Sequence, residues 1–210
     1  MSTHPPKPAS FSESLRPKAA KILQPLGQVM IRLHITANML TFLGVVLAGV
    51  VGVLVATGNL FWGGVFLILS APMDALDGTV ARLTGIMSKF GAFWDSTLDR
   101  YSESLVLLGV LIYGLNKGDA WIGVLAFVTV FGSLLVSYAR SRAETLGIEC
   151  KVGIMTRLER VVVTILMLLL NPLYPDVPVL IGLGLMAVFT NLTVIMRIVH
   201  VRREMDRGGI

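Results

Sequence analysis

Four aspartates interrupt the apolar stretches of this 210-residue chain, and their spacing indicates that they act together: Asp74, Asp77, Asp95 and Asp99. A carboxylate at the centre of a membrane-spanning helix costs about 2.5–3.5 kcal/mol on insertion scales, so such residues are usually functional. Residues three or four apart share a helix face, which puts each pair of aspartates on one side of its own helix. Four neighbouring carboxylates repel one another unless cations bridge them, and oxygen ligands suit Mg²⁺, Mn²⁺ or Ca²⁺. We therefore expect a divalent-metal site, and the single cysteine excludes a thiolate zinc site.

Small residues share the helix faces of these aspartates, at Gly78, Ala81 and Gly91. They leave room for a bulky ligand beside the carboxylates, and Arg82 stands where it can meet a phosphate. Two other interpretations are open: structural ion pairs with nearby Lys or Arg residues, and a cation or proton transporter. The small residues favour a ligand site over ion pairs. Because the aspartates lie near one membrane surface, an enzyme is favoured over a transporter, whose acids lie near the midplane. A catalytically silent scaffold is a third alternative.

The composition places these residues in a membrane protein. Apolar residues make up 54% of the chain and charged residues 15%, whereas soluble domains carry about 25% charged residues. A span needs about 20 mostly apolar residues, and long apolar runs without alternation favour helices over barrel strands. We expect an all-α integral membrane protein with six transmembrane helices, at about 37–56, 60–81, 90–115, 120–142, 160–170 (or from 156) and 179–201.

The chain before the first span has a different character. Residues 1–10 contain three prolines and predict a disordered tail, and residues 11–36 carry apolar residues at helical spacing between basic ones. The second pattern predicts a basic amphipathic helix in the membrane interface. Residues 37–202 then form the six-helix domain, and residues 203–210 form a tail. With six spans, every Lys and Arg except Lys117 falls on one side. The positive-inside rule therefore places both termini and the aspartates in the cytoplasm of a multi-pass cell-membrane protein. Its partner is the lipid bilayer, and no nucleic acid is expected.

Residues 74–99 read D-x2-D-G-x2-A-R-x8-G-x3-D-x3-D. This pattern resembles the signature of the CDP-alcohol phosphatidyltransferase family at every specified position. The resemblance implies an enzyme of phospholipid synthesis that uses two Mg²⁺ or Mn²⁺ ions. Such enzymes transfer a lipid-phosphate group from CDP-diacylglycerol, or from its ether-lipid equivalent CDP-archaeol, to an alcohol and release CMP. The resemblance also implies that all four aspartates bind metal and that Asp99 is the catalytic base. The nucleotide-binding residues that it implies are Asn38, Thr41, Asp74, Asp77, Gly78, Ala81 and Arg82.

The acceptor alcohol must be recognised by residues outside this motif. The loop between the fourth and fifth predicted spans is rich in Arg and Lys, which the positive-inside rule explains only in part. Clustered Arg side chains also bind phosphate monoesters. Residues 137–160 resemble the same region of phosphatidylinositol-phosphate synthases and their archaeal counterparts, although Arg140 stands where Lys is familiar in bacterial members. This resemblance implies inositol phosphate as the acceptor, held by Arg140, Arg157 and Arg197. Glycerol phosphate is the alternative acceptor.

Other residues have supporting roles in this interpretation. We expect Glu144 and Glu159 to orient the arginines, and His200 to be a surface residue. The family resemblance further implies a homodimer. Four glycines on the third and fourth predicted spans would permit close helix packing: Gly109, Gly114, Gly123 and Gly132.

Overall fold

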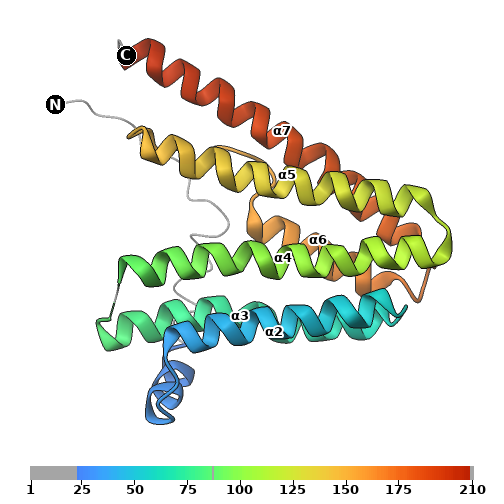
Figure 1. The fold of residues 1–210 in the computed structure, drawn as a ribbon, viewed down its shortest axis with the longest axis horizontal. Helices are drawn as coiled ribbons and strands as arrows, with labels where there is room; N and C mark the ends of the chain where they lie inside the picture. The colour runs from blue at the N-terminus through green and yellow to red at the C-terminus, as the bar shows by residue number, and fades with distance from the viewer. Residues whose placement is uncertain (1–22, 87, 209–210) are drawn as a thin grey trace.

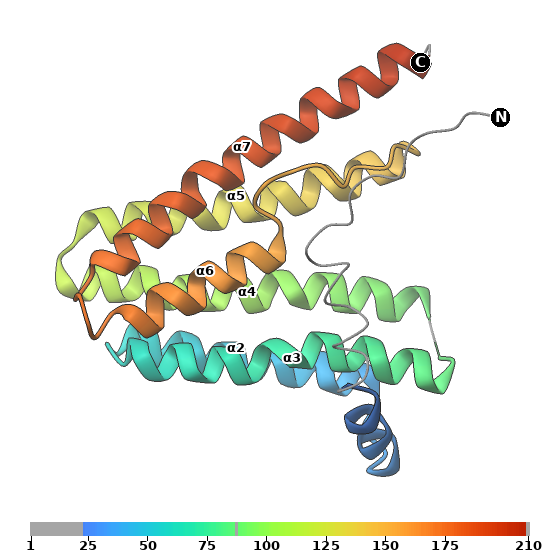
Figure 2. The ribbon, with the colours of Figure 1, turned by 180° about the vertical axis from the view of Figure 1, so that it is seen from behind.

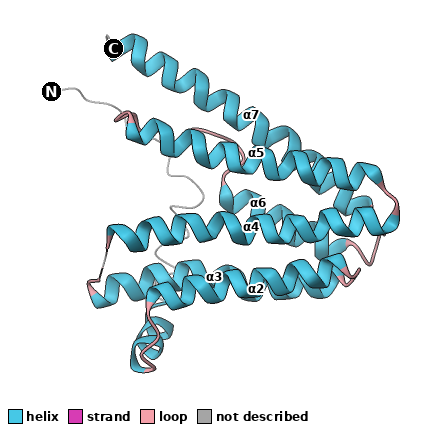
Figure 3. Ribbon diagram, viewed as in Figure 1, coloured by secondary structure: helices cyan, strands magenta, loops and turns pink. Residues whose placement is uncertain are grey.

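The computed structural model describes residues 23–86 and 88–208, and every regular element within them is a helix (Figures 1 and 3). The predicted tail 1–10 and the first part of the predicted interfacial helix, 11–22, lie outside the described residues. The helices are α2 (Ala37–Ala56), α3 (Leu60–Thr84), α4 (Lys89–Lys117), α5 (Ala120–Thr145), α6 (Arg157–Leu170) and α7 (Val177–Gly208). All six predicted helices are present with ends close to those expected, except that α7 continues through residues 203–208, where the sequence predicts a tail.

The six helices pack as a ring, in the order α2, α4, α5, α7, α6, α3 and back to α2. Consecutive helices run in opposite directions, as Figures 1 and 2 show from the two sides. The start of α2, the junction between α3 and α4, and the C-terminal ends of α5 and α7 therefore lie at the same end of the bundle. The two helices that carry the aspartates, α3 and α4, both pack against α2.

Four helices are long and apolar enough to cross a membrane: α2, α3, α5 and residues 177–207 of α7. The helix α4 has 29 residues, but it carries the charged residues of the motif. The helix α6 has 14 residues, or about 21 Å of helix at 1.5 Å per residue, whereas the hydrocarbon core of a bilayer is about 30 Å thick. Length and composition thus support an all-α membrane protein and four of its six predicted spans.

Polar side chains fix the helix ends at the end of the bundle where α3 is joined to α4, which we call the motif end. Thr36 caps α2, where its Oγ1 accepts a hydrogen bond from Met39 N at 3.3 Å, and Ser88 caps α4, where its Oγ accepts one from Gly91 N at 2.8 Å. Gly85 ends α3 in the left-handed conformation with φ of 69°, which glycine adopts without strain. The positive ends of two helix dipoles therefore meet at this end.

Glycines bring α2 and α4 into backbone contact. A Cβ at Gly52 would lie 2.6 Å from Leu105 O, and one at Gly109 would fall on the backbone of Gly52. A Cβ at Gly114 would meet α5, and one at Gly132 would meet α7. Three of the four glycines predicted to permit close helix packing, Gly109, Gly114 and Gly132, therefore pack against helices of the same chain, and the homodimer stays a prediction.

Residues 23–32 form a helix that projects from the bundle beside the start of α2 (Figure 1). It packs closely on α3, since a Cβ at Gly27 would lie 3.1 Å from Leu83 and 3.2 Å from Thr79. Its opposite face exposes Leu26, Val29 and Leu33. The described part of the predicted amphipathic segment is thus helical and two-faced, and its position in the membrane interface stays a prediction.

Candidate active site

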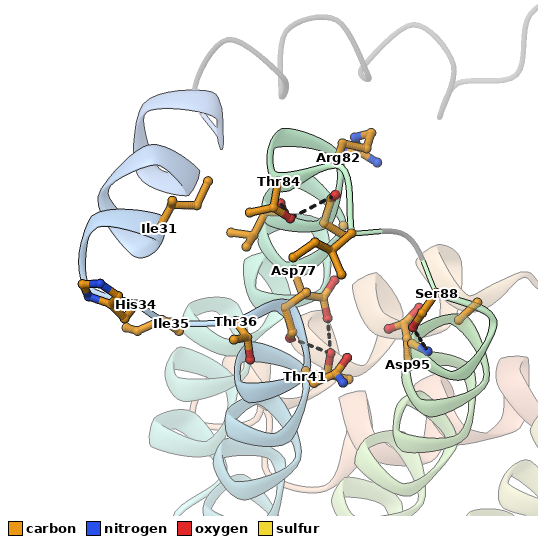
Figure 4. A pocket seen from close by; sticks show the side chains of 18 residues that line it. Ile31, His34, Ile35, Thr36, Thr41, Asp77, Arg82, Thr84, Ser88 and Asp95 are labelled. Carbon is orange, nitrogen blue, oxygen red and sulfur yellow. Dashed lines mark hydrogen bonds between the residues drawn. The ribbon is translucent and has the colours of Figure 1, made fainter.

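A cavity of about 600 Å³ opens where α2 and α4 begin and α3 ends (Figure 4). Asp95 of α4 lines it, and the segment between residues 31 and 36 closes part of its wall. Most of the predicted nucleotide-binding residues also line this cavity: Asn38, Thr41, Asp77, Gly78, Ala81 and Arg82. Residues far apart in the sequence thus form one pocket, large enough for a ligand of nucleotide size.

Asp77 lines this cavity, and Figure 4 shows its side chain directed toward Thr41. Its side chain is buried, with 4% of its surface exposed, and its Oδ2 accepts a hydrogen bond of 2.7 Å from Thr41 Oγ1. A hydrogen bond to an ionised acceptor is about twice as strong as a neutral one. Thr41 therefore orients the Asp77 carboxylate and ties α3 to α2.

Asp74 and Asp99 face a different partner, the guanidinium of Arg157 at the start of α6. The same nitrogen, Nη2, lies 2.5 Å from Asp74 Oδ2 and 2.8 Å from Asp99 Oδ1. Because one atom contacts both carboxylates, they are close enough to share a single cation. Asp74 lies on the wall of a second cavity, of about 340 Å³, between α2, α3, α4 and α6, whose lining combines apolar side chains with charged ones that include Arg157.

The four aspartates have the chemistry that a hard divalent cation prefers, since all of their ligand atoms are carboxylate oxygens. Asp99 Oδ1 is buried and accepts no hydrogen bond, although the Arg157 nitrogen lies nearby. A buried carboxylate oxygen that has an ion-pair contact but accepts no hydrogen bond fits a metal ligand. Within the described residues, however, no three His, Cys, Asp or Glu side chains already converge around one point. The carboxylates must therefore move closer to one another to surround an ion together.

The three predicted acceptor arginines make different contacts. Arg140 is exposed and pairs with Glu144 at 2.8 Å, as expected for Glu144. Arg197 is buried, and its guanidinium donates to the backbone carbonyls of Val152, at 3.0 Å, and of Val136. Arg157 contacts the aspartates. The Arg197 side chain is occupied by main-chain groups, a role that sequence spacing does not reveal.

Glu159 also differs from its prediction. Its Oε2 accepts a hydrogen bond of 2.9 Å from Thr156 N and a second one from the Thr156 hydroxyl. This is the capping box that starts α6, so Glu159 defines the first turn of the helix that carries Arg157.

A buried ion pair next to the aspartates escaped the sequence analysis. Arg160 is 2% exposed, and its Nε and Nη2 lie 2.5 and 2.8 Å from the two carboxylate oxygens of Glu103. Glu103 stands four residues after Asp99, one turn further along the same face of α4. That repeat is the signal in the sequence, because a third acid on an apolar helix face requires a partner.

These features define a helical membrane protein with an acidic site beside a pocket of nucleotide size. The family model for CDP-alcohol phosphatidyltransferase matches residues 34–199, so the chain belongs to the CDP-alcohol phosphatidyltransferase family. The enzyme class predicted from the motif is thereby confirmed.

Relatives and solved structures of similar length agree with this assignment. The chain is 35% identical to archaetidylinositol phosphate synthase of Pyrococcus horikoshii over 92% of its own length and 98% of the relative's. It is 33% identical to phosphatidylinositol phosphate synthase of Cutibacterium acnes over 92% and 99%. Crystal structures of phosphatidylinositol phosphate synthase of Mycobacterium tuberculosis share 28% identity. The structure with CDP-DAG bound has a TM-score of 0.79 over 86% of this chain and 94% of that one. The structure in complex with manganese and citrate has a TM-score of 0.78 over 85% and 88%.

Proposed function

We propose that this protein transfers a phosphatidyl or archaetidyl group from a CDP-linked lipid to inositol phosphate and releases CMP. The observation that carries the proposal is the cavity at the end of α3, where six predicted nucleotide-binding residues, Asp77 among them, meet the carboxylate of Asp95. The similarity of the whole chain to synthases that make inositol phospholipids supports the acceptor. Glycerol phosphate, the alternative acceptor, has no comparable support.

The residues of the cavity and the aspartates beside it have distinct tasks in this reaction. The N-termini of α2 and α4 and the side chain of Arg82 attract the diphosphate, and Gly78 and Ala81 leave space for the cytidine. Asp74, Asp77, Asp95 and Asp99 would hold two Mg²⁺ or Mn²⁺ ions, which neutralise the diphosphate and favour an in-line displacement. Asp99 accepts the proton of the acceptor hydroxyl while that oxygen bonds to the lipid-linked phosphorus and the bond from this phosphorus to CMP breaks.

Arg157 provides the link to the acceptor. Its guanidinium lies between Asp74 and Asp99, beside the carboxylate that we assign as the base. An arginine at this point can bind the phosphate of inositol phosphate and place its hydroxyl near Asp99. Arg140 and Arg197 are weaker candidates, because Glu144 and two main-chain carbonyls occupy them.

The membrane arrangement that we propose has six crossings, with both termini and the aspartates on the cytoplasmic side. Both α5 and α7 end at the motif end of the bundle. The chain between them must therefore cross to the opposite end, and α6 with its flanking loops makes this crossing (Figure 2). In this arrangement residues 37–202 are the catalytic domain, the helix before them lies in the interface, and the protein is a homodimer as the family resemblance implies.

The test is release of CMP by purified protein in lipid vesicles. Reactions contain CDP-diacylglycerol or CDP-archaeol, Mg²⁺ or Mn²⁺, and one of three acceptors: inositol phosphate, glycerol phosphate or free inositol. We expect transfer to inositol phosphate that EDTA abolishes and that Asp99→Asn reduces at least about 10²-fold, the lower range for a general base. The control is Asp206→Asn, an exposed carboxylate near the end of α7, which should retain full activity. Release of CMP only with glycerol phosphate would contradict the acceptor, and no release with any alcohol would contradict the enzyme.

A further inference from the structure

The segment between α5 and α6 is held along one face of α7. Arg197 Nε donates to Val152 O at 3.0 Å, and His200 Nε2 lies 3.0 Å from Glu149 O. One turn earlier, Thr193 contacts the last residues of the segment. Positions 193, 197 and 200 share one helix face, so α7 provides a row of polar side chains for this otherwise irregular stretch.

Thr193 makes the contacts closest to the active site. Its Oγ1 accepts hydrogen bonds from Ile154 N at 3.2 Å and Met155 N at 3.1 Å, and it donates one to Phe189 O at 2.7 Å. A hydroxyl has one proton and two acceptor sites, so the hydroxyl of Thr193 is fully used. The residue is completely buried, and water cannot replace it as the partner of the two amides.

Gly153 permits this close approach. Its φ is +139°, and a Cβ there would fall on the methyl carbon of Thr193. A side chain at position 153 would be strained by its backbone conformation and would also push the segment away from α7. The pair of Gly153 and Thr193 therefore fixes the distance between the segment and the helix.

The two amides that Thr193 holds lie directly before the arginines of α6. Met155 O accepts a hydrogen bond of 3.2 Å from Arg160 Nη1, and Thr156 is the N-cap of α6. Arg157, the first residue of the helix, contacts Asp74 and Asp99. The place where α6 begins, and with it the position of the Arg157 guanidinium, is therefore set from α7.

We infer that Thr193 is a positioning residue for the acceptor side of the reaction: its hydroxyl holds the amides of Ile154 and Met155 and so places Arg157 at the aspartates. The inference rests on the proposed function, in which Arg157 binds the acceptor phosphate. Thr193 itself touches neither substrate. The cavity for the CDP-linked lipid is lined by residues between 31 and 95, so Thr193 lies outside it and acts on the acceptor through Arg157.

The test compares Thr193→Val, which keeps the shape and removes the hydroxyl, with Thr193→Ser, which keeps the hydroxyl. The matched control is Thr190→Val, one turn away and equally buried, whose hydroxyl bonds only to carbonyls of its own helix. Each variant is purified as a monodisperse protein, and kcat and KM are measured for inositol phosphate and for CDP-diacylglycerol.

We expect Thr193→Val to raise the KM for inositol phosphate, and by that rise to lower kcat/KM for this acceptor by about ten- to a hundredfold, the cost of a misplaced binding group. Its KM for CDP-diacylglycerol should stay near the wild-type value, and Thr193→Ser and Thr190→Val should behave like wild type. If Thr193→Val is not recovered folded, Thr193→Ala is judged by the same criterion. A fall in kcat with both KM values unchanged would indicate a purely structural role and overturn the inference, as would an equal loss in Thr190→Val. Absence of transfer in the wild type would instead refute the proposed function.

Discussion

Removal of the Arg157 side chain should strengthen the binding of Mn²⁺ while it weakens catalysis. The guanidinium contacts Asp74 at 2.5 Å and Asp99 at 2.8 Å, so it competes with a metal ion for two of the proposed ligands. Its Nε is buried without an acceptor, which shows that the guanidinium is not fully satisfied in this position. In Arg157→Gln the carboxylates lose both a hydrogen-bond donor and a repelling positive charge near the metal.

The size of the effect follows from these contacts. Hydrogen bonds to charged groups contribute about 1.5–3 kcal/mol, and the Arg157 side chain is 35% exposed, so solvent screening favours the lower end. At about 1.4 kcal/mol for each factor of ten, the Kd for Mn²⁺ should fall by about tenfold. Transfer to inositol phosphate should fall in the same variant, because the acceptor phosphate loses its proposed partner.

Isothermal titration of Mn²⁺ into the purified protein, without substrates, measures the first effect independently of activity. Arg140→Gln is the matched control, because Arg140 is an exposed arginine paired with Glu144 and its removal should leave the Kd unchanged. Asp99→Asn should weaken Mn²⁺ binding in the same assay. A Kd for Arg157→Gln equal to that of the wild type, or higher, would refute the reasoning that arginine and metal share the carboxylates.

Two further predictions concern the stability of the helix bundle. Gly52→Ala should lower the Tm by several degrees, because its Cβ would lie 2.6 Å from a backbone carbonyl oxygen of α4 and overpacking costs about 1–3 kcal/mol. The control in the same thermal scan is Gly49→Ala, whose Cβ would have nothing within 4 Å. An equal shift of Tm in both variants would argue against the contact. Asp176→Asn should reduce the Tm in a pH-dependent way. Partial burial raises the pKa of Asp176, but hydrogen bonds from Lys117 and Tyr113 outweigh it and lower the pKa below the usual value of 3.8. The stabilisation is therefore present above about pH 4 and is lost as the pH falls through the lowered pKa, so a pH-independent difference between variant and wild type would contradict this assignment.

The helices and the nucleotide side of the site follow from local patterns in the sequence. Apolar runs gave the six helices with nearly correct ends, because each run is bounded by a turn or a capping residue such as Thr36, Ser88 or Gly85. Helical periodicity placed Asp77, Gly78 and Ala81 on one face, and the same three residues line the cavity. These features depend on residues close in sequence.

The acceptor side depends on contacts between distant segments, and the sequence does not indicate which groups each arginine contacts there. Nothing in the spacing of Arg140, Arg157 and Arg197 distinguishes a side chain that binds phosphate from one that binds main-chain carbonyls. That choice is made by the path of residues 149–155, which Thr193 and Arg197 hold from α7. The eleven-residue loop 146–156, which has no regular structure, carries no periodicity from which this path could be predicted.

The position of the aspartates relative to one another is set by α2, which lies against both helices that carry them. Along one face of α2, Thr41 bonds to Asp77, Gly44 faces the carboxylate of Asp74, and Gly52 meets the backbone of α4. Ala48, which is buried, lies on the same face between Gly44 and Gly52. Polar and small residues thus recur every three or four positions along this face of a helix that is otherwise rich in Leu and Val. Small residues let α3 and α4 approach the α2 backbone from two sides, and the approach brings their carboxylates near enough to share a cation. The distance between the two halves of the motif is therefore encoded in a helix that contains no aspartate.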